Sequence, residues 1–387
     1  MPNTIDLLLK NHPDGWAWTK VRAGERLTLN EGVRLICEGD LSALGMMADY
    51  ARRKRWGGKA FYGNSANINH TNECILDCDL CAWKRPFQPK RLHPEAYVVE
   101  GDDLIKRIDE AVRQGAWEIH IVGGITPRLD LGYYEWLLTT IRDRAPHIFI
   151  QGFTAIEIRY IAKLHRLTPH ALLEKFQTWG LGSVPGGGAE LFHPRVRNLI
   201  AKNKESAEEW IEIHQTAHRM GLHSNATMLY GTLEEPHEIV HHLDMLRNAQ
   251  DETGGFLALI PLAFLPANTK LEGKVHGTTG TYDARIFALS RIFLDNFPHI
   301  RILWTYQGPR MTQTLLSYGV DDIGGASLDE EIAREAAGYS DNAFTASHLA
   351  RLLAEAGREA TPVDSIYNPA PSRQVLKQAS ASLLSPL

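Results

Sequence analysis

The stretch AFYGNSANINHTNECILDCDLCAW, residues 60–83, places a predicted strand directly before a cluster of cysteines. We expect residues 60–69 to form the first strand of a sheet, with the cysteines in the loop that follows. Cys74, Cys78 and Cys81 have C-x3-C-x2-C spacing and are three of only four cysteines among 387 residues. Cys37, far upstream in a helical pattern, is predicted to be an ordinary core residue. Because so few cysteines cannot build a disulfide scaffold, the cluster predicts a metal centre.

Downstream of this stretch, short apolar runs alternate with longer helical patterns. The predicted strands are 117–122, 147–153, 181–185, 222–231, 256–264 and 300–306, and a last short strand is expected directly before residues 321–325. Capping boxes, Thr154 with Glu157 and Ser206 with Glu209, mark the starts of two of the helices between them. A third helix is expected to begin with Thr168 as its cap and Pro169 at its first position. Roughly seven or eight strand–helix units predict an α/β fold, a parallel (β/α) TIM-type barrel, in preference to an open sheet.

The flanking segments lack this alternation. We expect residues 1–55 to form a helical N-terminal extension and residues 56–332 to form the barrel. Residues 333–387 are predicted to be a helical tail that packs on the barrel and frays at its Pro/Ser-rich end. All three segments are expected to pack as one unit.

Composition excludes several functional classes. The chain is 44% hydrophobic and carries a net charge of −5, so it has no basic footprint for nucleic acid or anionic membranes. No stretch approaches the ~18 to 20 apolar residues that span a bilayer. The N-terminal residues show no charged segment followed by a long apolar one, so we expect no signal peptide. The prediction is a cytoplasmic protein without nucleic-acid or membrane partners; no feature specifies its oligomeric state.

Three interpretations of the cysteine cluster are open from the residues alone. The thiols could be buried side chains that happen to be adjacent. They could bind zinc, with His70 as the fourth ligand that a structural site requires. They could instead hold an iron–sulfur cluster through three thiolates, which leaves one iron free to bind a small molecule. The third interpretation uses every cysteine of the motif and needs no further protein ligand.

The cysteine spacing, in the loop after the first strand of a barrel, resembles that of the radical S-adenosylmethionine (SAM) superfamily. The resemblance implies a [4Fe-4S] cluster with one open iron, which binds SAM and reductively cleaves it to a 5′-deoxyadenosyl radical. It also implies an electron donor such as flavodoxin or ferredoxin. One position departs from the pattern: Leu80 precedes the last cysteine where an aromatic residue is usual, and Trp83 is expected to supply that packing.

The same resemblance suggests where SAM binds. Gly123 and Gly124, at the end of the second predicted strand, resemble the glycine motif whose backbone receives the SAM amino group. Glu157, Ser183 and Arg195 are candidates for its ribose and amino-acid groups. All of these residues except Ser183 also have a simpler explanation: a strand-to-loop turn for the glycines, a capping box for Glu157 and a solvated surface position for Arg195.

Longer segments narrow the resemblance to the aminofutalosine synthase family. The similar segments are PGGGAELF (185–192), QDETGGFLALIPLAF (250–264) and GVDDIGG (319–325). The family adds the adenosyl radical to the enol ether 3-[(1-carboxyvinyl)oxy]benzoate, which gives 6-amino-6-deoxyfutalosine for menaquinone synthesis and consumes SAM as a co-substrate. The implied partner is a small-molecule carboxylate.

Candidate residues for this acceptor lie near predicted strand ends. Asn69, His70, Gly187 and Gly188 are expected to bind substrate, and Asn225, Tyr230, Asp321 and Asp322 to act in catalysis. The two aspartates could instead close the barrel bottom or cap a helix.

Several positions depart from the family pattern and affect the predicted acceptor pocket. They are Ser65, Ala66, Asn67, Thr126, Thr232 and Leu265, most of them in place of histidine or arginine. Two alternatives to the synthase reaction therefore remain: addition of the radical to another substrate, and hydrogen abstraction as in the related dehypoxanthine futalosine cyclases. An electron carrier is the non-enzyme alternative, although carriers usually ligate every iron.

Overall fold

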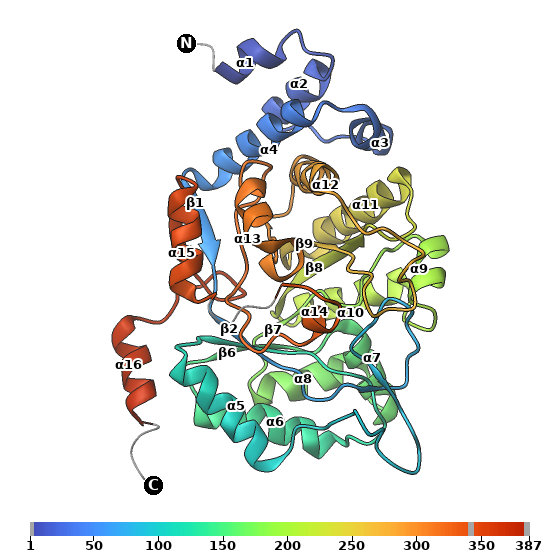
Figure 1. Cartoon of the computed structure of the whole chain (residues 1–387), viewed down its shortest axis with the longest axis vertical. Coiled ribbons are helices and arrows are strands. Elements are labelled where there is room, and N and C mark those ends of the chain that lie inside the picture. The colour runs from blue at the N-terminus through green and yellow to red at the C-terminus, as the bar shows by residue number, and fades with distance from the viewer. Residues whose placement is uncertain (1–3, 340–343, 383–387) are drawn as a thin grey trace.

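A computed structural model describes residues 4–339 and 344–382 of the chain. At its centre lies an all-parallel seven-stranded sheet with the order β10-β9-β8-β7-β6-β5-β2. The strands are β2 (Ser65–Ile68), β5 (Glu118–Ile121), β6 (Phe149–Gly152), β7 (Ser183–Val184), β8 (His223–Tyr230), β9 (Phe256–Ala263) and β10 (His299–Ile300). Within this sheet the strands follow one another in chain order, and only β3 and β4, which form a separate pair, lie between β2 and β5 in the sequence. The sheet curls into a half-barrel, and the predicted (β/α) class is confirmed (Figure 1).

An irregular segment, residues 321–328, crosses the gap between the two edge strands and is called the closing segment below. Asp322 bridges in parallel to Arg301 beyond β10 and to Phe61 in β1 (Lys59–Tyr62), and Leu328 bridges to Ala66 in β2. Backbone hydrogen bonds accompany these bridges, including Asn67 N–H to the Leu328 carbonyl at 2.8 Å. The predicted last strand is therefore replaced by a bent segment that satisfies the backbone of both edges.

Helices cover the outer face of the curled sheet (Figure 1). They are α5 (Gly101–Arg113), α6 (Leu131–Arg144), α7 (Ala155–Leu164), α8 (Pro169–Trp179), α9 (Pro194–Ile200), α10 (Ala207–Arg219), α11 (Pro236–Thr253), α12 (Gly280–Phe293) and α13 (Trp304–Leu315). The predicted caps form: Thr168 accepts from the Ala171 N–H, and Ser206 and Glu209 form a capping box. Helices on the outer face are what a parallel sheet needs, because its strands are buried on both sides.

The N-terminal residues form α1 (Thr4–Leu9), α2 (Gly15–Ala23), α3 (Leu29–Glu38) and α4 (Leu41–Trp56). α4 packs on α12, and α3 packs on α11 and α12. Cys37 corrects one expectation, because it is exposed on α3 instead of lying in the core. No helix within residues 4–339 and 344–382 has both the length and the apolar composition that crossing a bilayer requires.

The C-terminal segment is not wholly helical, contrary to expectation. It contains α14 (Ile332–Glu335), α15 (Ala346–Glu355), β11 (Glu359–Pro362) and α16 (Arg373–Ser382). β11 pairs in parallel with β1 (Lys59–Tyr62), at the start of the barrel. The predicted frayed end includes residues 383–387, which lie outside the described residues. The division of the chain into extension, barrel and tail remains a prediction.

Two strand predictions were wrong in length. The expected first strand, residues 60–69, is divided at Gly63 and Asn64, because β1 pairs with β11 whereas β2 pairs with β5. The expected strand 300–306 ends early, because α13 begins at Trp304. A short apolar run does not by itself distinguish a strand from the first turn of a buried helix.

Asp321 is fully buried where the closing segment meets β10. It forms ion pairs with Arg291 of α12 and with His299 of β10, and it accepts the Ile300 N–H at 2.9 Å. Burial acts to raise the pKa of Asp321, but Arg291 and His299 outweigh it and hold that pKa below its ordinary value. Asp321 therefore ties the closing segment to both a strand and an outer helix.

Replacing Asp321 by asparagine tests this role. We expect D321N to lower the free energy of unfolding by about 3–5 kcal/mol, because it leaves buried Arg291 without its counter-charge. Urea unfolding followed by circular dichroism measures the change. D143N is the matched control, because Asp143 is 67% exposed in its pair with Arg142 and such pairs contribute less than about 1 kcal/mol. Equal effects of the two substitutions would contradict the assignment.

Candidate active site

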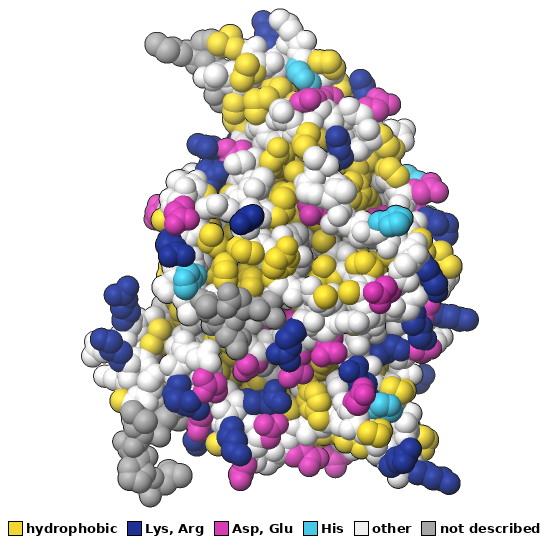
Figure 2. Space-filling model, viewed as in Figure 1, with side chains coloured by type: hydrophobic (Ala, Val, Ile, Leu, Met, Phe, Trp, Pro, Cys, Tyr) yellow, Lys and Arg dark blue, Asp and Glu magenta, His cyan; other side chains and the backbone are white. Residues whose placement is uncertain are grey.

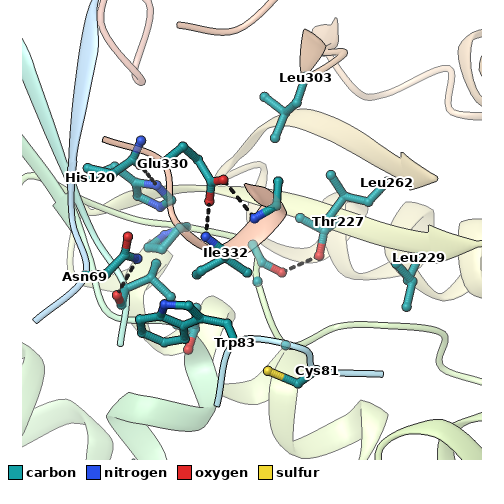
Figure 3. Close-up of a pocket in the computed structure, with 18 of the residues that line it drawn as sticks. Asn69, Cys81, Trp83, His120, Thr227, Leu229, Leu262, Leu303, Glu330 and Ile332 are labelled. Atoms are coloured by element: carbon teal, nitrogen blue, oxygen red, sulfur yellow. Dashed lines mark hydrogen bonds between the residues drawn. The ribbon is translucent and has the colours of Figure 1, made fainter. Parts of the chain in front are cut away.

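A cavity of ≈ 360 Å³ opens at the carboxyl ends of the strands. Its lining comes from β2, β5, β6, β8 and β9 and the residues that follow them, from the loop after β7, from the segment after β10 and from the cysteine loop. This is the end of a (β/α) barrel at which catalytic groups are found. In Figure 3, Asn69, His120 and Glu330 lie on one side of the cavity and Leu229 and Leu262 on the other (Figure 3).

All three clustered cysteines line this cavity. Cys74 belongs to the short strand β3 (Glu73–Cys74), which pairs with β4 (Arg85–Pro86), and its Sγ accepts the Leu76 N–H at 3.4 Å. Burial raises the pKa of the Cys74 thiol and raises that of Cys78 to about 11. Thiolates are the ligand form, so a bound metal must supply the positive charge that stabilises them here.

The thiols fit a cluster better than a single zinc ion. Ligands of one tetrahedral zinc would place sulfur atoms roughly 4 Å apart. Within the described part of the chain, the cysteines are not among the groups whose ligand atoms all lie within 4.8 Å. His70, the expected fourth zinc ligand, lies behind Gly123 among the rings of Tyr133, Tyr134 and Phe153. Three separated thiols facing one cavity suit a multinuclear cluster.

Gly123 and Gly124 line the cavity as predicted, and the contacts behind them add a second reason for glycine. A Cβ on Gly123 would lie 2.1 Å from the His70 ring, and one on Gly124 would lie 2.2 Å from the Glu73 carbonyl oxygen. Burial lowers the pKa of His70 to about 3, so this ring is neutral. His70 therefore supports the glycine backbone and is not among the residues that line the cavity, so this placement does not support its predicted role in substrate binding.

Glu157 and Ser183 lie one layer behind the cavity wall. Glu157 accepts hydrogen bonds from the Gly123 N–H at 2.9 Å, the Thr154 N–H at 2.8 Å and the Thr154 hydroxyl at 2.6 Å. Ser183 accepts from Gln151 at 3.0 Å. Thr154 and Gln151 themselves line the cavity. The two predicted residues thus position groups that face the cavity.

The glycine-rich loop after β7 borders the cavity with Gly186, Gly187 and Gly188. A Cβ on Gly186 would lie 2.6 Å from the Asn225 carbonyl oxygen, and Gly188 has a φ of 89°. Close packing on β8 and a left-handed turn therefore explain two of the three glycines. The third, Gly187, accepts a hydrogen bond from the Trp210 indole at 3.2 Å.

Two buried amides face the cavity without all their partners. Asn69 donates to the Val122 carbonyl at 3.0 Å, but its Oδ1 has no hydrogen bond in the structure. Neither side-chain polar atom of Asn225 has one, although Asn225 is only 1% exposed. Buried polar atoms are almost always paired, so these two side chains indicate that a polar ligand occupies the cavity.

Charged groups that were not predicted mark the two ends of the cavity. Lys204 pairs with Glu190 at the cysteine end, where both influence the pKa of Cys78. Arg301 lies at the other end, where burial, together with the Arg301 charge, lowers the pKa of His120 to about 4. The sequence gives no sign that these residues line a cavity, because each lies in an ordinary strand or loop pattern. Their role as cavity residues is visible only from their burial and from their contacts with distant parts of the chain.

Arg301 and His120 are linked to neighbouring polar groups. The Arg301 Nε donates to Asp322 at 2.7 Å, and the His120 Nδ1 lies 3.3 Å from the Asn67 Oδ1. The His120 Nε2 is buried without a hydrogen bond. Asp322 is therefore a structural partner of Arg301, and neither it nor Asp321 lines the cavity. Their predicted catalytic role is not supported by this placement.

Tyr230 and Arg195 also lie outside the cavity lining. The Tyr230 hydroxyl is buried and donates to Asp283 at 2.8 Å. Arg195 lies at the surface and donates to both carboxylate oxygens of Glu238, at 2.8 and 2.6 Å. Trp83, by contrast, lines the cavity, as does Leu80, and the Trp83 indole donates to Glu331 at 3.3 Å. That Trp83 supplies the packing of an aromatic residue at position 80 remains a prediction.

The positions that depart from the family pattern divide into two groups. Ser65, Asn67 and Leu265 line the cavity. Ala66 is buried in the core, Thr126 donates to Glu73 at 2.5 Å and Thr232 donates to Glu234 at 2.8 Å. Three of the six residues that differ from the family pattern therefore change the lining of the cavity.

Comparison with known proteins gives two matching families. Residues 68–246 match the Radical SAM superfamily, and residues 253–374 match the CofH/MqnC C-terminal region. The chain is 38% identical over 351 residues to the aminodeoxyfutalosine synthase of Thermus thermophilus, a match that covers 90% of this chain and 93% of that protein. It is 37% identical over 321 residues to the cyclic dehypoxanthine futalosine synthase of Streptomyces coelicolor, which covers 82% and 79%.

A solved structure supports the fold. The FeFe-hydrogenase maturase HydG from Carboxydothermus hydrogenoformans superposes with a TM-score of 0.70, covering 94% of this chain and 83% of that one. Its sequence identity is 17%, so the likeness concerns the fold alone.

Iron content tests the assignment of the cysteines. We expect C74S, C78S and C81S each to lose most of the iron and sulfide that the reconstituted wild-type protein holds, because each removes one thiolate of the cluster. C37S is the matched control and should retain both, because Cys37 lies exposed on α3. Full iron in any of the three variants would contradict its assignment as a ligand.

Glu157 should make stability depend on pH. Burial raises its pKa to about 7, although hydrogen bonds from Thr154 and Gly123 oppose the shift. An unfolded glutamate has a pKa of about 4.3, so the stabilisation from the extra proton is complete below that pH and is lost as pH rises through about 7. The free energy of unfolding of the wild type, relative to E157Q, should fall by about 2–3 kcal/mol between about pH 5 and pH 8.

Denaturant unfolding at several pH values, with E209Q as a second reference, measures this difference. Glu209 also closes a capping box, but hydrogen bonding to Ser206 lowers its pKa, so no fall is expected in that range. A flat difference between wild type and E157Q would show that Glu157 keeps an ordinary pKa.

Proposed function

The chain belongs to the radical SAM superfamily, and we propose that this enzyme adds the 5′-deoxyadenosyl radical to 3-[(1-carboxyvinyl)oxy]benzoate to give, after radical rearrangement and loss of the enol-ether carboxylate, 6-amino-6-deoxyfutalosine. The similarity to an aminodeoxyfutalosine synthase along nearly the whole chain is the observation that carries the proposal. The reaction would serve menaquinone biosynthesis and consume SAM as a co-substrate, because the adenosyl group stays in the product.

Cys74, Cys78 and Cys81 would hold a [4Fe-4S] cluster and leave one iron for SAM. When bound, the cluster supplies the electron that cleaves the S–C5′ bond of SAM, after reduction by a donor such as flavodoxin or ferredoxin. The protein's own contribution is then to place two ligands side by side and exclude competing reactions.

The cysteine end of the cavity offers the groups that SAM needs. The backbone around Gly123 and Gly124 lies beside the cysteine loop and is open to an amino group. Lys204 supplies a cation at this end, and Thr154, held by Glu157, supplies a hydroxyl. We assign Glu157 and Ser183 as positioning residues, because they act through Thr154 and Gln151.

The opposite end suits an aromatic acid with two carboxylates. Arg301 uses its Nε for Asp322 and its NH2 for Tyr367, which leaves guanidinium N–H groups for a carboxylate. Asn69 and Asn225 offer unpaired amide atoms. Apolar side chains complete the wall for a benzoate ring: Leu229, Leu262 and Leu303. This arrangement would bring the alkene within ~3 to 3.5 Å of the adenosyl C5′.

A second candidate function rests on the departures at Ser65, Asn67 and Leu265, all of which line the cavity. In this alternative the radical is transferred to another acceptor, or it abstracts hydrogen and is released as 5′-deoxyadenosine. The similarity to a cyclic dehypoxanthine futalosine synthase is consistent with the second of these reactions.

An anaerobic reaction separates these functions. Reconstituted protein is mixed with SAM, dithionite and 3-[(1-carboxyvinyl)oxy]benzoate, and the products are read by mass spectrometry. We expect 6-amino-6-deoxyfutalosine as the main product. Free 5′-deoxyadenosine without an adduct would mean that SAM cleavage is intact and that the acceptor is wrong.

The variant N225A tests the acceptor site within the same assay. We expect kcat/KM for the enol ether to fall about tenfold to a hundredfold, because a ligand hydrogen bond to a buried amide is lost. T232A is the control and should keep wild-type activity, because Thr232 contacts Glu234 outside the cavity. Equal activity of N225A and T232A would remove Asn225 from the site.

A further inference from the structure

A second group of potential metal ligands lies on the outer surface, away from the cavity. The sequence HEIVH, residues 237–241, forms the second to sixth positions of α11. Two histidines four residues apart project from the same side of a helix. Histidine and acidic side chains lie close together at the surface over α9 and α11 in the space-filling view (Figure 2).

A third histidine, His193, meets this pair from the residue that precedes α9. The ring centroid of His193 lies 5.7 Å from that of His237 and 5.7 Å from that of His241, with interplanar angles of 84° and 85°. Imidazoles bound to one tetrahedral ion through nitrogens at ~2.0–2.1 Å have centroids roughly 5 Å apart. The ligand atoms of His193 and His237 already lie within 4.8 Å of one another, whereas those of His241 lie outside that group, so the His241 ring must rotate toward the other two to share one ion.

Glu238 lies behind His193 and is fully buried. Its Oε1 lies 2.7 Å from the His193 Nδ1, although the angles are not those of a hydrogen bond and a turn of the ring is needed to make one, and ligand atoms of His193, His237 and Glu238 all lie within 4.8 Å of one another. A carboxylate on one ring nitrogen fixes the tautomer of a metal-binding histidine and leaves the other nitrogen for the ion. Because Arg195 also engages both Glu238 oxygens, this carboxylate is not free to act as the general base of a peptidase.

The three histidines border a surface cavity of ≈ 520 Å³ between helices. Its other lining residues come from α3, α9, α10 and α11 and include Glu208, a further oxygen donor. An ion here would connect the start of α9 to α11. α9 in turn follows the loop of residues 185–193, part of which borders the active-site cavity.

We propose that His193, His237 and His241 bind one divalent transition-metal ion of the zinc class, and that Glu238 holds the His193 ring in position. The site is independent of the iron–sulfur cluster and of the reaction that the enzyme catalyses. Its ion is a structural link between helices.

Zinc binding to the reconstituted holoenzyme tests the proposal. Chelator-washed protein is dialysed against Zn²⁺, and zinc and iron per chain are measured by mass spectrometry of the elements. We expect one zinc per chain in addition to undiminished iron, with zinc X-ray absorption showing nitrogen and oxygen ligands at ~2.0–2.1 Å. Sulfur scattering at ~2.3 Å would instead place the zinc at the cysteines and overturn the proposal.

Substitutions assign the ligands. H193Q, H237Q and H241Q should each weaken zinc binding at least tenfold, and E238Q should weaken it about tenfold to a hundredfold through the His193 ring. H237Q keeps the fold intact, because His237 is exposed, so its loss of zinc cannot be ascribed to unfolding. H170Q, at an exposed position of α8, is the matched control. Wild-type zinc affinity in H193Q and H237Q would overturn the proposal.

Zinc should also raise the melting temperature of the wild type and of H170Q, but not that of H237Q. The same rise in H237Q would show that the stabilising ion binds elsewhere, and would overturn the site.

Discussion

The contact between the end of β5 and the cysteine loop is the constraint on which the active site depends. The Gly124 N–H donates to the Thr71 carbonyl at 2.6 Å, and the Ile75 N–H donates to the Ile125 carbonyl at 2.7 Å. The backbones can approach this closely only because positions 123 and 124 have no side chain: a Cβ at either would overlap the His70 ring or the Glu73 carbonyl. This contact aims three thiols and a glycine backbone into the same cavity.

The cavity has two chemically different ends, and the contact between β5 and the cysteine loop lies at one of them. Lys204 and Glu190 lie with the cysteines, whereas Arg301 and His120 lie at the far end. Between them the wall combines leucines with amides that have unpaired atoms. A radical enzyme needs such a division, because its two ligands must be bound separately and yet meet at one point. The departures at Ser65, Asn67 and Leu265 change the lining of this cavity but leave the cysteines and glycines in place.

The closing segment and the C-terminal tail keep this geometry from opening. Asp321 and Asp322 bind Arg291 and Arg301, so the segment is attached both to an outer helix and to the cavity wall. β11 then extends β1 in parallel, and the Tyr367 hydroxyl from the tail donates to Asp322 at 2.6 Å. Buried charges of this kind favour one arrangement of the chain, because any other would leave a charge unpaired.

The sequence by itself determined the parts of this protein that follow from local pattern and covalent chemistry. The alternation of strands and helices, the caps at Thr168 and Ser206, and the C-x3-C-x2-C motif are all local features, and each was predicted. The sequence pattern also predicted Asn69 and Asn225 as site residues, because Asn69 follows one strand and Asn225 lies within another, and both strands contribute to the cavity.

Only the tertiary structure decided which titratable side chains face that cavity. Lys204, His120 and Arg301 do, whereas His70, Tyr230 and the aspartate pair do not. It also placed β11 against β1 and His193 beside α11. The physical reason is that these placements depend on which distant elements pack together, and on the desolvation that such packing imposes, which a one-dimensional pattern does not contain.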